Sequence, residues 1–164
     1  MKEGMLQMNI SDRKGAAMVE FALVAPIFLL LVFGVFEFGR YFFVQHTIQY
    51  ATREGARIAL VGVRLQNPDN TYMTREESII RTIRENAAIA VDPAELQISI
   101  FPVGAGYSDP DEWETTVNAG EGGDYMRVRV LYTYRFLVPL IGDFFPSGTD
   151  VIEAQMLYRN ELFS

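Results

Sequence analysis

Hydrophobic and polar residues follow three successive patterns along the chain, and each pattern predicts a different kind of element. Residues 16–36 are almost continuously apolar and contain a single charge, at Glu20. From residue 37 to about residue 62, apolar positions recur at helical spacing and no proline interrupts them. Shorter amphipathic segments and polar loops follow over residues 63–164. The pattern predicts one long helix over residues 16–62 and a separate α+β domain after it.

A second helix is predicted after the polar loop at residues 64–73. Thr74 and Glu77 have the spacing of a capping box, in which each side chain accepts a hydrogen bond from the other residue's backbone N–H. The apolar residues that follow fall on one helix face: Ile79, Ile80, Ile83 and Ala87. We expect the helix to end by Val91-Asp92-Pro93, because proline does not continue a helix.

Alternation of apolar and polar residues predicts three strands, because successive side chains of a strand point to opposite faces. The clearest strand covers residues 125–136 and has one apolar row: Met126, Val128, Val130, Tyr132, Tyr134 and Phe136. Strands at residues 95–101 and 149–160 have similar rows: Leu96, Ile98 and Ile100 in one, Ile152, Ala154, Met156 and Tyr158 in the other. If the last strand pairs antiparallel with the clearest one, Glu153 meets an arginine across the ladder. The expected fold class is α+β, with two helices and an antiparallel sheet of about three strands.

The apolar run over residues 16–36 has the length of a membrane span. At ~1.5 Å per residue, a helix over this run is about 30 Å long, which matches the hydrocarbon core of a bilayer. A secretory signal has a shorter apolar core and a small-x-small cleavage site, and neither is present here. The basic residues Lys2, Arg13 and Lys14 precede the run, so the amino terminus is expected inside and residues 63–164 outside. The alternative is a fully buried core helix.

The outer end of this run carries charged and aromatic residues. Glu37 and Arg40 are three residues apart, a spacing at which we expect a local ion pair on the helix. Tyr41, Phe42 and Phe43 follow directly and are typical of an aromatic belt at a membrane–water interface. The helix would continue beyond them as an amphipathic extension over 37–62.

Charge and composition narrow the possible partners. The net charge is −7, and from residue 41 onward ten Arg stand against seventeen Asp and Glu. A nucleic-acid-binding surface needs a net basic face, so nucleic acid is not expected as a partner. The chain has no cysteine, which excludes disulfides and cysteine-based metal sites.

No arrangement of residues points to catalysis or to a cofactor. His46 is the only histidine and has no evident catalytic partner, so a structural role is favoured. The glycine-rich loop at residues 102–124 holds acidic residues that could ligate calcium: Asp109, Asp111, Glu112, Glu114, Glu121 and Asp124. Their spacing differs from that of a calcium-binding EF-hand loop, which favours a solvated acidic loop instead. We therefore expect a protein that is not an enzyme and has no metal and no cofactor.

The start of the apolar run carries the most specific motif in the chain. Gly15 is followed by Ala16-Ala17-Met18-Val19-Glu20-Phe21 and then by the spanning segment. This resembles the processing site of type IV pilin-like proteins. The resemblance implies that a prepilin peptidase cuts after Gly15, that Ala16 becomes the new amino terminus, and that Glu20 is then the fifth residue. Phe21 matches the Glu-aromatic pair of the Flp/Tad branch.

Two further segments extend the resemblance. "ATREGARIAL" at residues 51–60 is similar to the Gly-Ala-Arg segment of the TadE-like family of pilus proteins, and the closing "EAQMLYRNE" is similar to the strand that ends such chains. The likeness is close over residues 13–60 and covers most of the remainder in outline, although the middle loop departs from it. It implies a pilin-like fold and a subunit that supports pilus biogenesis, adhesion and surface colonisation.

Elementary energetics are consistent with that resemblance. A lone carboxylate in a spanning helix costs about 2.5–3.5 kcal/mol. After cleavage, the ammonium of Ala16 and the positive helix terminus would offer Glu20 a partner, in its own chain or in a neighbour. The alternative is that Glu20 reaches the headgroups and pairs with nothing. Further along, Ala51, Gly55 and Ala59 recur every four residues, and their small side chains allow another element to approach closely.

The resemblance thus implies a TadE-like minor pilin or pseudopilin of a Flp/Tad pilus. Minor status follows from its length, because the major Flp pilins have little beyond the helix. The predicted organisation is a cleaved cytoplasmic leader at 1–15, a span at 16–36, its extension at 37–62 and an external domain at 63–164. The expected partners are the cytoplasmic membrane, the prepilin peptidase, other Flp/Tad pilins and pseudopilins, and the assembly platform. The alternative is a membrane-anchored external binding module, unrelated to pili, that keeps its first 15 residues.

Overall fold

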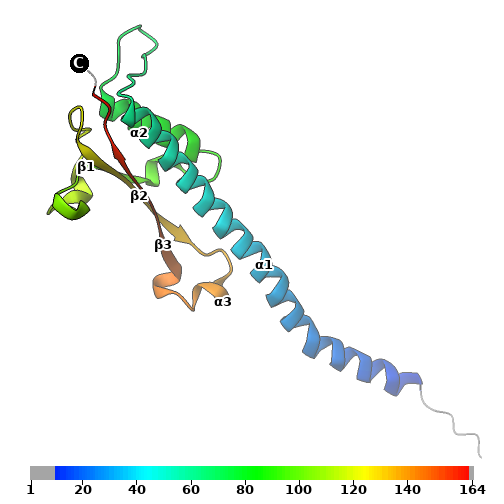
Figure 1. Cartoon of the computed structure of the whole chain (residues 1–164). Helices are drawn as coiled ribbons and strands as arrows, with labels where there is room; N and C mark the ends of the chain where they lie inside the picture. Colours follow the sequence, from blue (N-terminus) through cyan, green and yellow to red (C-terminus); the bar gives the residue numbers. More distant parts are fainter. Residues whose placement is uncertain (1–9, 163–164) are drawn as a thin grey trace, which may run out of the picture.

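One helix runs the whole length of the molecule and carries a small α+β headpiece on its C-terminal half (Figure 1). This computed structural model describes residues 10–162. Helix α1 spans Ile10–Leu60 without a break, although Pro26 lies inside it. It begins before residue 16, the predicted start, because the polar residues just before Gly15 include no helix breaker. The first nine residues of the predicted leader lie outside the described residues.

The C-terminal end of α1 has an identifiable cause. Gly62 adopts a left-handed φ of 67°, and its N–H donates to the carbonyl of Ala59 at 3.1 Å. The N–H of Val63 donates to the carbonyl of Ile58, also at 3.1 Å. These two bonds form a Schellman motif, which satisfies carbonyls at the helix end and requires the conformation that glycine adopts most easily. The helix therefore stops close to the predicted end at residue 62.

Helix α2 (Arg75–Ala87) confirms the prediction from the capping box. The Thr74 side chain accepts from the N–H of Glu77 at 3.1 Å, and the Glu77 carboxylate accepts from the N–H of Thr74 at 2.9 Å. Ile79, Ile83 and Ala87 are fully buried. The helix ends at Ala87, a few residues before the predicted end at Val91-Asp92-Pro93.

The sheet has three antiparallel strands, as predicted, and their order, which the sequence left open, is β1-β2-β3. The strands are β1 (Gln97–Pro102), β2 (Tyr125–Arg135) and β3 (Thr149–Arg159). In the middle of the ladder, Val130 pairs with Ile98 on one side and with Ala154 on the other. The apolar row of β2 is buried almost throughout, whereas Met156, in the apolar row of the edge strand β3, is 39% exposed.

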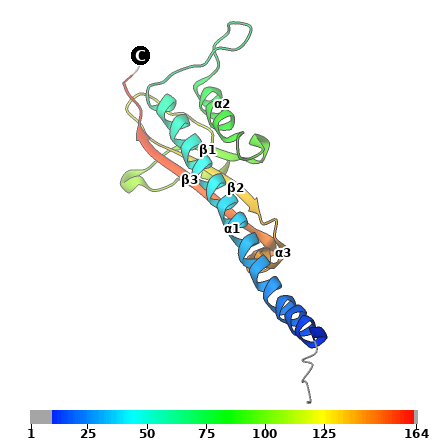
Figure 2. The ribbon, with the colours of Figure 1, turned by 90° about the vertical axis from the view of Figure 1, so that its right-hand side faces the viewer.

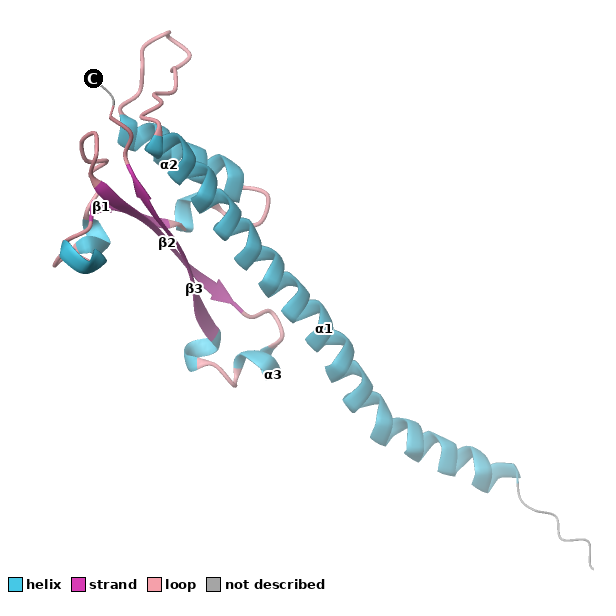
Figure 3. Ribbon diagram, in the orientation of Figure 1, coloured by secondary structure: helices cyan, strands magenta, loops and turns pink. Residues whose placement is uncertain are grey.

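Short helical turns complete the headpiece, which we define as residues 61–162. They are α3 (Pro139–Gly142) and four 3-10 turns, Pro93–Glu95, Ala105–Tyr107, Trp113–Thr115 and Pro146–Gly148. The C-terminal half of α1 and α2 lie on one face of the sheet, and the N-terminal half of α1 projects beyond it (Figures 2 and 3). This long apolar helix, second helix and three-stranded sheet form a pilin-like α+β arrangement.

Candidate functional site

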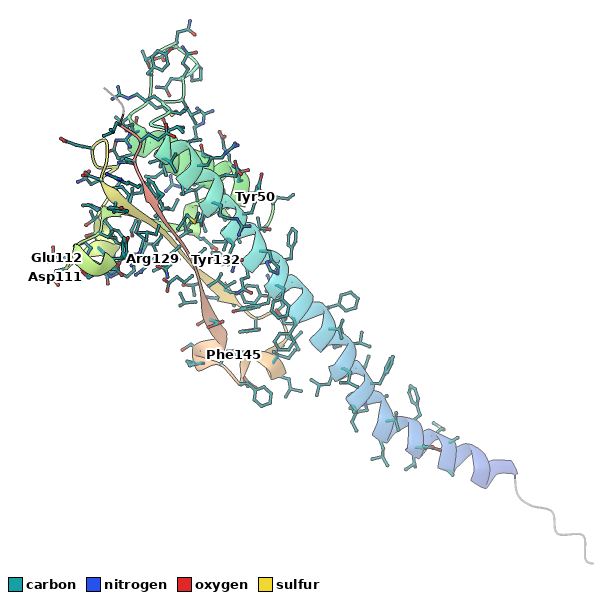
Figure 4. All side chains as sticks on the ribbon, in the orientation of Figure 1. Tyr50, Asp111, Glu112, Arg129, Tyr132 and Phe145 are labelled. Atoms are coloured by element: carbon teal, nitrogen blue, oxygen red, sulfur yellow. The ribbon has the colours of Figure 1, made fainter. Side chains whose placement is uncertain are left out.

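Within the described residues, the headpiece covers almost none of the N-terminal half of α1. The most apolar stretch has a mean hydropathy of 2.5 and none of it is buried within the described residues. Side chains stand free on all sides of this part of the helix (Figure 4). A core helix of this domain would be covered by the headpiece, so the described structure does not match that alternative. By length, composition and exposure this half of α1 has the properties of a single membrane anchor.

The motif residues Gly15, Ala16, Glu20 and Phe21 all lie on this exposed half. Ala16 and Glu20 are one helical turn apart and therefore share a face. Within the described part of the chain Glu20 forms no ion pair and no hydrogen bond from its side chain. A methyl group added at Gly15 would meet nothing within 4 Å. The motif is thus presented to the surroundings and has no role in holding the fold.

A buried carboxylate joins α1 to the far end of the sheet. Glu37 is 3% exposed, although the residues on either side of it are exposed. Its Oε1 accepts from the hydroxyl of Tyr134 at 2.7 Å. Its Oε2 accepts from the backbone N–H groups of Leu137 and Val138, at 2.9 and 2.8 Å. One side chain on the helix therefore fixes the end of β2 and the loop that follows it.

Arg40 and Tyr41 extend this contact by one turn of the helix. Arg40 forms the predicted local pair with Glu37 at 3.3 Å, donates to the carbonyl of Arg135 at 2.6 Å, and lies 4.3 Å above the ring of Tyr134. The hydroxyl of Tyr41 donates to Asp150 at 2.7 Å. Tyr41, which we predicted in an aromatic belt, therefore packs against the headpiece.

Three aromatic rings fill the space between these polar contacts. Tyr41 packs edge-on against Tyr134 at 5.1 Å and stacks on Phe136 at 6.2 Å. We name Glu37, Arg40, Tyr41, Tyr134 and Phe136 the base cluster. Aromatic pairs of this kind add to the energy of area burial, so the base cluster is a rigid joint between α1 and the sheet.

The ionisation of the base cluster follows from its contacts. Burial on its own would raise the pKa of Glu37, but the hydrogen bonds from Tyr134, Val138, Leu137 and Arg40 outweigh burial and lower it from the ordinary 4.5. Burial, together with the bond to Asp150, raises the pKa of Tyr41 to about 12. Burial and the bond to Glu37 also raise the pKa of Tyr134. At neutral pH Glu37 is a carboxylate and both phenols are protonated donors.

The small residues of the outer half of α1 face the headpiece. Ala51, Gly55 and Ala59 are buried, and a methyl group at Gly55 would stand 2.4 Å from Cγ1 of Ile83. Helix α2 can therefore approach α1 only because position 55 lacks a side chain. The partner of this face in the folded chain is its own second helix.

The acidic loop is attached to the opposite face of the sheet. Asp109 pairs with both Arg127 and Arg129, and Arg129 stacks on Trp113 at 4.1 Å. Arg129 also lies 3.1 Å from Glu153, so the predicted cross-strand pair is present. Figure 4 shows Arg129 beside the turn that carries Asp111 and Glu112, which point outward. Among the described residues, no group of three or more His, Cys, Asp or Glu is arranged to hold a metal ion.

His46 is exposed on α1. It borders a shallow depression between α1 and the end of α2, together with Phe43, Tyr50 and Ile89. Glu85 lines the same depression and pairs with Arg81 at 2.7 Å.

Comparison with known families identifies the segment that contains the motif. The sequence model of the TadE-like protein family matches residues 15–57. Over these residues the chain is similar to TadE-like proteins. The family is structural and pilus-associated and is not a known family of enzymes. Comparison with curated proteins and with solved structures gives no match.

The TadE-like segment and the helix nearly coincide. The match begins at Gly15, the first residue of the motif, and ends at Arg57, in the last turn of α1. Glu37 lies inside the TadE-like segment, but three of its four hydrogen-bond partners lie outside it. The sequence signal that could have revealed the role of Glu37 is its position, a single acidic residue directly after the apolar run over residues 16–36. We interpreted Glu37 only as one member of a local ion pair with Arg40.

Proposed function

We propose that this TadE-like chain is a structural and assembly subunit, a minor pilin or pseudopilin, of a Flp/Tad-type pilus. Residues 16–36 span the cytoplasmic membrane with the amino terminus inside and the headpiece outside. A prepilin peptidase removes residues 1–15. The observation that carries the proposal is the uncovered apolar half of α1, which presents the Gly15–Glu20 spacing where the TadE-like segment begins.

Cleavage after Gly15 would give Glu20 its partner. The new ammonium of Ala16 adds a full positive charge to the positive end of the helix dipole. Glu20 lies one turn further along the same face, and unpaired it costs about 2.5–3.5 kcal/mol in the bilayer. A neighbouring pilin whose helix packs in register offers the same ammonium, so pairing between chains removes this cost and favours assembly.

The surface available for such packing is the inner half of the helix. Ala51, Gly55 and Ala59 are occupied by the chain's own headpiece, so they serve the fold of the subunit. Most of residues 15–36 are exposed in the single chain and are therefore available to lipid or to other helices. The headpiece is then carried outside the membrane, where it contacts other pilus components and supports biogenesis, adhesion and colonisation.

The experiment that tests this role is complementation of a deletion strain with three full-length variants. Glu20→Ala should be processed normally yet fail to restore pili and surface attachment, because the fold does not use Glu20. Gly15→Ala should accumulate as unprocessed chain, although a methyl group at Gly15 meets nothing within 4 Å. The matched control is Glu54→Gln, which removes a carboxylate from the same helix outside the span and should complement fully. Normal pili with Glu20→Ala would contradict the proposed pairing.

A further inference from the structure

The loop between β2 and β3 ends in an exposed apolar surface. Leu137, Leu140 and Phe144 are 70%, 54% and 82% exposed. We name these three residues the apolar tip. Over residues 136–149 the sequence contains one charged residue, Asp143. A cluster of large, exposed apolar side chains marks a surface that a membrane or another molecule covers.

The position of the apolar tip along α1 identifies what lies around it. Ile141, in the same loop, reaches α1 at Gly34, where its Cδ1 is 4.0 Å from the place of an added Cβ. Leu30, Leu31, Gly34 and Phe38 line an apolar depression with Ile141 at this contact. Gly34 lies in the last turn of the run over 16–36. At ~1.5 Å per residue it is only about 3–5 Å inside the end of that run.

The loop is held at this level by rigid contacts. Glu37 accepts from the N–H groups of Leu137 and Val138, at the start of the loop. Phe145, at its end, stacks on Phe136 at 4.2 Å. Both ends of the loop are thus tied to the base cluster. The apolar tip cannot leave the level of the helix run without breaking these contacts.

Most backbone N–H groups of the loop have acceptors within the protein. The N–H groups of residues 141 and 142 both donate to Val138, and those of Asp143, Phe144 and Phe145 donate to residues three or four positions earlier. Leu137 and Val138 donate to Glu37. A segment that enters the edge of a bilayer must pair its backbone internally, since hydrocarbon offers no partner. The loop meets most of that requirement through the turn at α3 and the carboxylate of Glu37.

We propose that the apolar tip lies in the outer leaflet, beside α1, as a second membrane contact of the subunit. The inference rests on the proposed spanning role of residues 16–36. The loop contacts α1 at Gly34 and therefore lies at the same level as the outer end of that span. Asp143 would stay among the headgroups, while the three apolar side chains enter the boundary of the acyl chains, as in interfacial helices. Two contacts with the bilayer fix the tilt of the headpiece. A subunit that leaves the membrane for a fibre must also withdraw this loop.

The chain has no cysteine, so single nitroxide labels can be placed without background. Full-length Phe144→Cys and Leu140→Cys would be labelled and reconstituted in phosphatidylcholine–phosphatidylglycerol vesicles at low protein density. Collision rates with oxygen, which concentrates in lipid, and with a water-soluble nickel chelate would be measured by electron paramagnetic resonance. Leu31→Cys serves as the control for the span. Tyr72→Cys, 65% exposed at the far end of the headpiece, is the aqueous control.

Phe144→Cys and Leu140→Cys should give oxygen-to-nickel ratios several-fold above that of Tyr72→Cys and below that of Leu31→Cys. A ratio equal to that of Tyr72→Cys, with Leu31→Cys deep in lipid, would overturn the inference and leave the span intact. If both reagents collide rarely with the labels at 140 and 144 and the spectra show spin–spin broadening, a second copy of the chain covers the apolar tip. That result would also overturn the inference. An aqueous Leu31→Cys would refute the span, and the tip inference with it.

Discussion

Replacing Glu37 by glutamine should release the headpiece from α1 while changing the side chain very little. A carboxylate accepts at both oxygens, and here each oxygen faces two donors: Tyr134 and Arg40 at one, Leu137 and Val138 at the other. Glutamine has one acceptor oxygen and one NH2 group, which is a donor. Two of the four donors around Glu37 would therefore lose their acceptor and face the NH2 group instead. Hydrogen bonds to an ionised group contribute about 1.5–3 kcal/mol each, and a buried unpaired donor costs about 1–3 kcal/mol. We expect Glu37→Gln to lower the free energy of unfolding by about 2–4 kcal/mol.

The assay is guanidinium unfolding of the full chain in detergent micelles, followed by the fluorescence of Trp113, the only tryptophan, in the headpiece. The matched control is Glu54→Gln on the same helix, where the carboxylate pairs with the exposed Arg57 at 3.0 Å. Pairs of this kind contribute at most about 0.5 kcal/mol. If Glu37→Gln were no more destabilising than Glu54→Gln, the base cluster would not be the joint between helix and sheet.

Three further outcomes follow from the contacts described. Gly55→Ala should destabilise the fold by about 1–3 kcal/mol in the same assay, because its methyl group meets Ile83 in a filled core; Gly39→Ala, which meets nothing within 4 Å, should be neutral or stabilising. Arg129→Gln should make the acidic loop a faster target in limited proteolysis at unchanged helix content, since Asp109 loses a partner; equal cleavage rates would refute the attachment. Because the folded pKa of Glu37 is lowered, its contribution is fully present above pH 4.5 and lost as pH falls through the folded value. Titrated Glu37→Gln should lack that component, and an unchanged acid profile would argue against it.

Local sequence signals account for most of the elements. The Thr74–Glu77 spacing determines where α2 begins, because both partners of the capping box lie within one turn. Strict alternation over residues 125–136 locates β2, because burial of one face imposes the period. These predictions needed no knowledge of distant contacts, and the structure confirms them.

The joint between α1 and the sheet could not be predicted in the same way. Glu37 and Arg40 pair as their spacing suggests, yet the main partners of Glu37 are 97 to 101 residues away in the chain. Tyr41 is of a residue type typical of membrane interfaces, and its packing against the headpiece depends on contacts with the distant residues Phe136 and Asp150. We likewise predicted a solvated acidic loop, because the sequence does not show that Asp109 pairs with Arg129, which lies two elements later in the chain.

The most direct test of the proposed function is the amino terminus of the chain purified from native membranes. Its intact mass and terminal sequence would be determined from cells with and without an active prepilin peptidase. We predict a chain that begins at Ala16 when the peptidase is active and at Met1 when it is not. A chain that begins at Met1 in both would contradict the pilin account. It would leave a membrane-anchored external module that keeps its first 15 residues.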